Sequence, residues 1–226
     1  MPFRNRTDAG RRLAEALKGY KGQQVVVYAL PRGGVEVAAE IAEALKSPLD
    51  LLLVRKIGVP FQPELAMGAV VDGGDPIIVR NADVIEETGT TPAEFDTVCK
   101  EEMAEIERRR KLYLAGRQAI DPAGKVAIVV DDGIATGATV RAALQAMRQR
   151  NPAKLVLAVP VAPPDTIEAL QDEADEIVCL ETPMYFHAIG SFYDDFRQLD
   201  DTDVIDSLRR SAQGISLHPQ ARARGQ

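Results

Sequence analysis

The residues best suited to chemistry in this chain lie in one stretch, from Val126 to Thr139. An apolar run ends at Asp131 and Asp132, and a turn of Gly, Ala and Thr follows before a helical pattern begins near Val140. Such a turn lets backbone N–H groups close around a phosphate, and the positive end of the next helix points to the same place. The two carboxylates would accept hydrogen bonds from vicinal hydroxyls or hold a Mg²⁺ that arrives with the ligand. The motif suits a sugar phosphate, although an acidic pair can also simply cap a helix.

Other phosphate and metal motifs are absent from the sequence. No Gly-Lys-Ser or Gly-Lys-Thr is present, and no Gly-x-Gly-x-x-Gly follows a strand pattern, so the two common nucleotide-binding loops are disfavoured. Cys99 and Cys179 are too few for a disulfide framework or a Cys-rich zinc site, and we expect both to fill the core. Neither His187 nor His218 has metal-ligand spacing beside it. Any metal should therefore arrive with a substrate.

Composition limits the class of protein. With 226 residues the chain fits one large domain at about 100–200 residues per domain. Apolar residues make up 46% and charged residues 27%, the balance of a soluble globular protein. The formal charge of −7 disfavours binding to DNA or other polyanions. Because no apolar run approaches the roughly 18 residues of a spanning helix, and Met1 to Tyr20 is polar, we expect a cytoplasmic protein without membrane contact.

The order of the apolar patterns predicts the fold. Five short apolar runs read as buried strands: Val25 to Leu30, Leu49 to Val54, Val126 to Val130, Leu155 to Val159 and Ile177 to Leu180. Helical patterns from Val35 to Leu45 and from Val140 to Met147 lie between them. The alternation predicts an α/β domain with a mostly parallel five-stranded sheet flanked by helices. Ligands of such sheets bind at the carboxyl ends of the strands.

Two further segments complete the predicted domain of residues 1–213, whose core spans about 22–182. Thr91, Pro92 and Glu94 form a capping box that begins a long helix extending to about Gly116. The preceding segment, Val71 to Gly89, reads as a hairpin or mobile flap, so the insertion would cover about 71–117. A hood over the site would comprise about 183–213 and the N-terminal helix, and we expect 214–226 to be a disordered tail.

The stretch from Val129 to Thr139 resembles the 5-phosphoribosyl 1-pyrophosphate (PRPP) motif of the type I phosphoribosyltransferases. The resemblance extends from Val25 to about Val204 and is greatest to a poorly characterised branch of that family. It implies that the acidic pair binds the ribose hydroxyls and that Ala135 to Thr139 bind the 5-phosphate. The implied PRPP-binding residues of this motif are Asp131, Asp132, Gly133, Ile134, Ala135, Thr136, Gly137, Ala138 and Thr139.

Two basic segments agree with the resemblance. Arg32, Gly33 and Gly34 follow the first strand, where the family keeps its pyrophosphate loop, often with a cis peptide; glycine allows the backbone to approach an anion closely. Arg55 and Lys56, which we expect to end the second strand, resemble a dipeptide that reaches pyrophosphate in some branches. With Asp131 and Asp132 they are the implied catalytic residues. An ordinary turn and a charged strand end are the structural alternatives for the two segments.

Aromatic residues gather after the last strand, between Pro183 and Phe196. This segment resembles the hood over the acceptor base in purine branches, with Tyr185 and Phe186 as the implied acceptor-binding residues. The alternative is that these aromatics fasten the carboxyl-terminal segment to the core. Asp194 is a candidate outer ligand, with Asp131 and Asp132, for a Mg²⁺ bound mainly through the substrate.

The resemblance implies a Mg²⁺-dependent pentosyltransferase, active in nucleotide salvage and commonly homodimeric, that transfers a phosphoribosyl group from PRPP to a nitrogenous base. Ala135 stands where the oxopurine branch usually has an acid, and Leu155 to Pro160 lacks that branch's Lys, which puts hypoxanthine or guanine in doubt. The alternative is a non-catalytic sensor of PRPP or nucleotides. Because Asp131 and Asp132 should sit at a solvent-facing strand end, we expect their Asn variants to keep the stability of the fold.

Overall fold

The computed structural model describes residues 2–72, 76–115 and 118–216. Its central sheet has five strands in the order β2-β1-β6-β7-β8, and every neighbouring pair is parallel. The strands are β1 (Val25–Ala29), β2 (Leu49–Leu51), β6 (Val126–Val130), β7 (Lys154–Val161) and β8 (Glu176–Glu181). The predicted α/β fold with a parallel five-stranded sheet is therefore confirmed.

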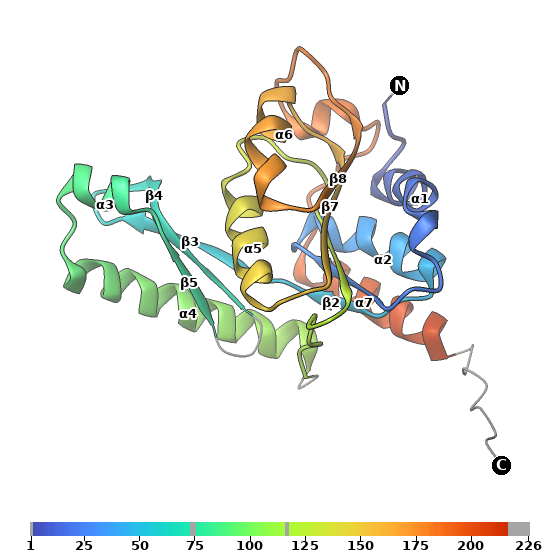
Figure 1. Cartoon of the computed structure of the whole chain (residues 1–226), viewed down its shortest axis with the longest axis horizontal. Helices are drawn as coiled ribbons and strands as arrows, with labels where there is room; N and C mark the ends of the chain where they lie inside the picture. The colour runs from blue at the N-terminus through green and yellow to red at the C-terminus, as the bar shows by residue number, and fades with distance from the viewer. Residues whose placement is uncertain (1, 73–75, 116–117, 217–226) are drawn as a thin grey trace.

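Helices cover both faces of this sheet (Figure 1). One face packs against α1 (Arg6–Ala16), α2 (Gly33–Leu45) and α7 (Asp201–Ser216), and the other against α5 (Ala138–Gln149) and α6 (Pro164–Leu170). Every residue of β1 and β6 is buried, because alternate side chains enter the two apolar layers. Short 3₁₀ helices complete the chain: η1 (Lys18–Tyr20), η2 (Gln171–Glu173) and η3 (Ile189–Phe192).

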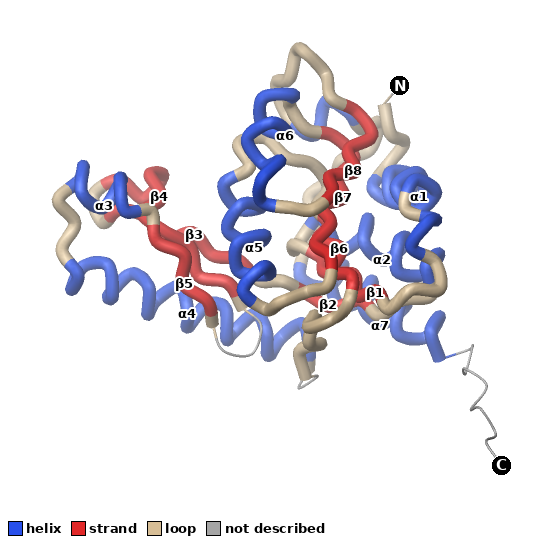
Figure 2. The backbone as a smooth tube through the Cα atoms, in the orientation of Figure 1, coloured by secondary structure: helices blue, strands red, loops and turns tan. Residues whose placement is uncertain are grey.

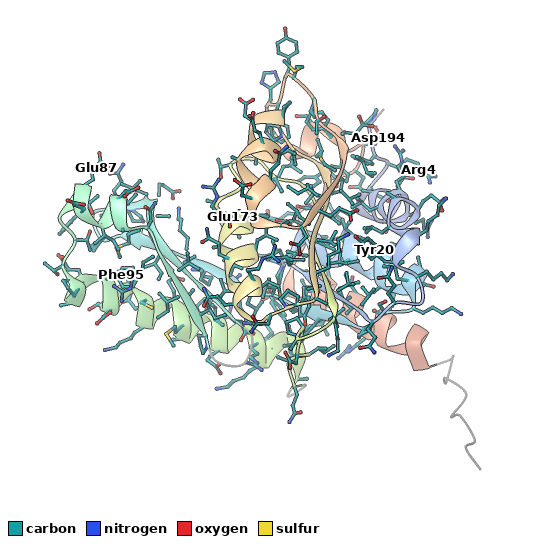
Figure 3. All side chains as sticks on the ribbon, viewed as in Figure 1. Arg4, Tyr20, Glu87, Phe95, Glu173 and Asp194 are labelled. Atoms are coloured by element: carbon teal, nitrogen blue, oxygen red, sulfur yellow. The ribbon has the colours of Figure 1, made fainter. Side chains whose placement is uncertain are left out.

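A second unit, which we call the arm (residues 54–114), projects from the core (Figure 2). It is an antiparallel sheet in the order β3-β4-β5 with two helices, and Phe95 of the longer helix lies buried against the strands (Figure 3). The elements are β3 (Val54–Val59), β4 (Gln62–Val71), β5 (Ile77–Arg80), α3 (Ala82–Thr88) and α4 (Pro92–Leu114). The predicted hairpin after Val71 is thus β4–β5, with residues 73–75 of the segment outside the described ranges.

The arm begins at Val54, whereas the sequence predicts an insertion that begins at about residue 71. The apolar run from Leu49 to Val54 spans two sheets: the N–H of Leu52 still bonds to the Ala29 carbonyl (3.0 Å), whereas the carbonyl of Leu53 accepts from Asp72 (2.8 Å). A continuous apolar run cannot reveal this change of partner, since Leu51, Leu52 and Leu53 are all buried where it occurs.

Polar contacts of two buried carboxylates and a tyrosine lie at the base of the arm and in the neighbouring core. The carboxylate of Asp72 accepts from Arg110 of α4 at 3.0 Å, and its backbone carbonyl accepts from Arg150. Asp50 accepts from the backbone N–H of Ile120 at 2.6 Å, and burial raises the pKa of this carboxyl. Tyr113 of α4 donates to Asp201 of α7 at 2.5 Å. Arg150 and Tyr113 thus join the base of the arm to the end of α5 and to α7.

The N-terminal segment packs against the segment that follows β8. Phe3 forms a parallel bridge with Tyr193, and its N–H donates to the Phe192 carbonyl at 2.7 Å. Helix α7 continues to Ser216, three residues into the predicted tail, and the rest of that tail (217–226) lies outside the described residues. Cys99 is buried and Cys179 half-buried, as expected of core residues. None of the helices that the structure describes combines the length and the apolar character needed to cross a bilayer.

The predicted capping box at the start of α4 is confirmed, and it gives a test of the arm. The Thr91 side chain accepts from the Glu94 N–H while the Glu94 carboxylate accepts from the Thr91 N–H. Thr91→Ala should lower the free energy of unfolding by about 0.5–2 kcal/mol, measured by urea denaturation, because it leaves the Glu94 N–H without its side-chain partner. Thr97→Ala is the control, since Thr97 lies on the same helix and only donates to the Ala93 carbonyl. Equal effects of the two variants would contradict the role of the cap.

Candidate active site

The acidic pair lies at the carboxyl end of β6, followed by the predicted turn and helix α5. Gly137 caps α5 with φ +77°, a left-handed conformation that favours glycine, and the N–H of Ile134 bonds to the Val161 carbonyl at 2.9 Å. The outward side of the turn is exposed at Ala135, Thr136, Ala138 and Thr139. Open amides and hydroxyls at the start of a helix form a cradle suited to an anion.

The second predicted loop packs directly on the acidic pair. β1 and β6 are neighbours in the sheet, so their carboxyl ends meet. A Cβ added to Gly33 would lie 1.8 Å from Oδ2 of Asp132, and one added to Gly34 would lie 2.7 Å from the Val130 carbonyl oxygen. The peptide bond between Pro31 and Arg32 is cis, as the resemblance implies. The structure therefore brings together the two loops that the sequence places about 100 residues apart.

The side chain of Arg32 bonds within the protein. Its Nη1 donates to the Leu199 carbonyl at 2.6 Å, in the segment that leads into α7. This contact ties the loop after β1 to the carboxyl-terminal part of the chain. The charge that Arg32 would offer an anion stays a prediction.

Arg55 and Lys56 lie within β3 of the arm, so the expectation that they end the second strand of the main sheet is wrong. Arg55 Nε lies 2.6 Å from Glu102 of α4, and Lys56 Nζ lies 3.2 Å from Glu64 of β4. Both basic residues line a cavity of about 500 Å³ that also includes Thr139 of the anion cradle. They therefore face the same space as the start of α5 while each holds an acidic partner.

The aromatic residues of the hood mostly pack on one another. Phe186 stacks on Phe192 with ring centroids 5.4 Å apart, and Tyr193 contacts both Phe3 and Phe196. Tyr185, by contrast, is 86% exposed. The predicted fastening role fits most of these side chains, and acceptor binding by Tyr185 and Phe186 stays a prediction.

Sequence reasoning missed the partners of Asp132. Arg6 of α1 donates from Nε to Asp132 Oδ2 at 2.7 Å, and the Tyr193 hydroxyl donates to the Asp132 carbonyl at 2.6 Å. The expectation of a solvent-facing Asp132 is wrong, because this side chain is buried in an ion pair. No periodicity or local motif links Arg6 to a residue 126 positions away.

The electrostatics of the pair are asymmetric. Burial raises the pKa of Asp131 well above its ordinary value, and the neighbouring charge of Asp132 raises it further. Arg6 acts in the opposite direction on the pKa of Asp131 and offsets one of the two negative charges. Burial also raises the pKa of Tyr193, so its hydroxyl keeps the proton that it donates to Asp132.

The donor set fits a Mg²⁺ bound through its substrate. Among the described residues no group of three His, Cys, Asp or Glu side chains could hold a metal, so Asp194 does not join Asp131 and Asp132 in a cage. Asp194 instead lies beside the N-terminal segment, near Arg4 (Figure 3), and its N–H donates to the Phe3 carbonyl. Mg²⁺ commonly takes one or two carboxylates together with substrate phosphates, which the acidic pair can supply.

The contact between the two loops gives a stability test. Gly→Ala in a helix normally stabilises by about 0.5–1 kcal/mol. Gly33→Ala should instead destabilise the protein by about 1–3 kcal/mol, because the new methyl group meets the Asp132 carboxylate. Gly19→Ala is the control, as a Cβ there meets nothing within 4 Å. A Gly33→Ala variant as stable as Gly19→Ala in urea denaturation would show that the loops are not in close contact.

Comparison with known proteins is consistent with this geometry. Residues 3–197 match the family model described as the phosphoribosyl transferase domain. Two curated proteins, from the Mycobacterium tuberculosis strains CDC 1551 / Oshkosh and ATCC 25618 / H37Rv, are provisionally named phosphoribosyl transferases. Each is 48% identical to this chain over 209 residues, which cover 92% of the chain and 47% of the relative. The chain thus spans about half the length of these relatives.

A solved structure agrees over nearly the whole chain. The crystal structure of TT1426 from Thermus thermophilus is 39% identical and superposes with a TM-score of 0.81, covering 93% of this chain and 99% of that one. The arrangement of core and arm is therefore shared with a protein solved by crystallography. From the match of the family model over residues 3–197, we conclude that the chain belongs to the phosphoribosyl transferase domain family.

Proposed function

We propose that the protein transfers the 5-phosphoribosyl group of PRPP to a nitrogenous base or related acceptor and releases pyrophosphate. The observation that carries the proposal is the contact of Gly33 and Gly34 with the carboxyl end of β6. It brings a glycine loop suited to one anion beside an acidic pair and a second anion cradle. Family membership supports phosphoribosyl transfer in general; the acceptor, the Mg²⁺ dependence, the homodimer and the salvage role belong to the proposal.

Each part of the site has a chemical role in this proposal. The exposed turn from Ala135 to Thr139 binds the 5-phosphate, helped by the positive end of α5. Asp131 and Asp132 accept hydrogen bonds from the ribose hydroxyls. The backbone N–H of Gly33 binds the pyrophosphate, whereas the Gly34 N–H donates to the Leu30 carbonyl at 3.1 Å. Glycine at both positions allows the anion to approach the backbone closely.

The reaction needs the leaving group to be stabilised. Positive charge develops at the anomeric carbon as pyrophosphate departs. Groups that bind the pyrophosphate more tightly in the transition state than in the ground state therefore accelerate the step. A bound Mg²⁺ would neutralise part of the pyrophosphate charge. Arg55 and Lys56 lie at the cavity shared with Thr139 and would act there after exchanging Glu102 and Glu64 for the substrate. Orientation of the sugar by both loops supplies the remaining acceleration.

A non-catalytic sensor of PRPP is the second candidate. The observation that favours it is that Asp132, Arg32 and Arg55 all hold partners within the protein. A site that has to break such pairs is suited to a conformational response as well as to catalysis.

An assay of pyrophosphate release distinguishes the two candidate functions. The protein is incubated with PRPP, Mg²⁺ and a panel of purine and pyrimidine bases, and released pyrophosphate is assayed. Base-dependent release that is lost in Asp131→Asn supports the transferase, because this variant removes a carboxylate charge from the proposed ribose site. Tight PRPP binding with no release from any base supports the sensor. Absence of PRPP binding in calorimetry contradicts both candidates.

The anion cradle can be tested by one hydroxyl. Thr136→Ala should weaken PRPP binding by about 1.5–3 kcal/mol, or roughly 10- to 150-fold in Kd, if the hydroxyl donates to the phosphate. Thr97→Ala on the arm is the control, since it removes a Thr hydroxyl far from the turn in sequence. A change in Kd below twofold for Thr136→Ala in calorimetry would mean that the hydroxyl does not bind the phosphate.

A further inference from the structure

The charged side chain of Arg6 is buried at the candidate site, although neither the motif nor the proposed reaction assigns it a role. Only 6% of the side chain is exposed. It comes from the first turn of α1 and reaches the carboxyl end of β6, in the middle of the sheet. A buried charge is costly unless it is paired and hydrogen-bonded, so its partners indicate what it does.

Three contacts fix the Arg6 guanidinium. Nε lies 2.7 Å from Oδ2 of Asp132, Nη1 donates to the Arg197 carbonyl at 2.9 Å, and Cζ lies 3.9 Å from the centroid of the Phe196 ring. The planar guanidinium is thus held between the hood and the acidic pair. Because the group cannot turn without losing at least one contact, it holds the Asp132 carboxylate in one orientation.

Asp132 is fixed from further directions. The Tyr193 hydroxyl donates to the backbone carbonyl of Asp132. The backbone of Gly33 lies so close to Oδ2 that a Cβ on residue 33 would clash with it. Arg6 takes up only part of the acceptor capacity of the Asp132 carboxylate, and the remaining lone pairs of its two oxygens can accept from a ligand hydroxyl. A carboxylate fixed in this way can distinguish a sugar with a hydroxyl at the matching position from one without it.

We propose that Arg6 is a positioning residue, which holds Asp132 so that the site selects ribose over deoxyribose phosphates. The proposal rests on the proposed function, since it assumes that Asp132 accepts from the sugar. It also links sugar recognition to the hood, because the same guanidinium contacts Phe196 and Arg197.

The test compares four ligands in the presence of Mg²⁺: ribose 5-phosphate, 2-deoxyribose 5-phosphate, 3-deoxyribose 5-phosphate and inorganic phosphate. Calorimetry gives Kd for wild type, Arg6→Gln, Arg6→Lys, Asp132→Asn and the Arg6→Gln/Asp132→Asn double variant. Arg11→Gln is the matched control, because Arg11 lies on the same helix in an exposed pair with Glu40. Thermal unfolding of each variant establishes that it is folded.

Wild type and Arg11→Gln should bind ribose 5-phosphate about tenfold more tightly than at least one deoxy analogue. Arg6→Gln should reduce that preference to about twofold or less and leave the Kd of inorganic phosphate unchanged, since the phosphate cradle does not depend on Arg6. Arg6→Lys retains the charge but lacks the planar guanidinium, so its preference should lie between those of wild type and Arg6→Gln. The double variant should lose no more preference than Asp132→Asn alone, because Arg6 acts through Asp132.

An unchanged preference in Arg6→Gln overturns the inference, and so does an equal loss of affinity for all four ligands, which a merely structural role would produce. If Arg6→Gln does not fold, Arg6→Lys decides: reduced preference with unchanged phosphate binding supports the role of Arg6, and wild-type preference refutes it. Wild type that binds ribose 5-phosphate without preferring it overturns this inference alone. Wild type that binds no ribose 5-phosphate overturns the proposed function as well.

Discussion

The site depends on the pairing of β1 with β6 in the middle of a parallel sheet. Parallel pairing brings the carboxyl ends of these strands to one edge, where the backbone at Gly33 lies against the Asp132 carboxylate. No larger residue fits there without moving an acid of the pair. The position of the glycine loop and the direction of the acidic side chains are therefore fixed by the same contact. The apolar layers on both faces of the sheet hold that contact in place.

Charge is balanced at the site by residues from distant parts of the chain. Arg6 of α1 pairs with the Asp132 carboxylate, and the Tyr193 hydroxyl donates to the Asp132 carbonyl. The Phe196 ring lies against the Arg6 guanidinium. The bridge of Phe3 with Tyr193 holds the N-terminal segment beside these contacts. An acidic pair next to a close-packed glycine loop is electrostatically unfavourable by itself, and the buried guanidinium offsets part of that repulsion. The hood is thus part of the electrostatic support of the acidic pair.

The arm shows where pattern reasoning works and where it fails. The long helix α4 was predictable from its capping box, because the cap is a local interaction between Thr91 and Glu94. The limits of the arm were not predictable, since the apolar run after Leu49 changes from one sheet to another without a change in composition. For the same reason Arg55 and Lys56 were placed on the wrong strand, although the cavity beside Thr139 brings them to the edge of the site.

Local patterns along the chain were enough to predict the parallel α/β core and the strand-turn-helix of the acidic motif, and they carry the family resemblance. These depend on local periodicity, on turn residues and on a contiguous motif, all of which are readable along the chain. Only the folded chain reveals that Asp132 is buried with Arg6, that Arg32 bonds to Leu199 and that most hood aromatics pack on one another. Such contacts join residues far apart in sequence, and their partners are selected by the packing of whole elements, which no local pattern records.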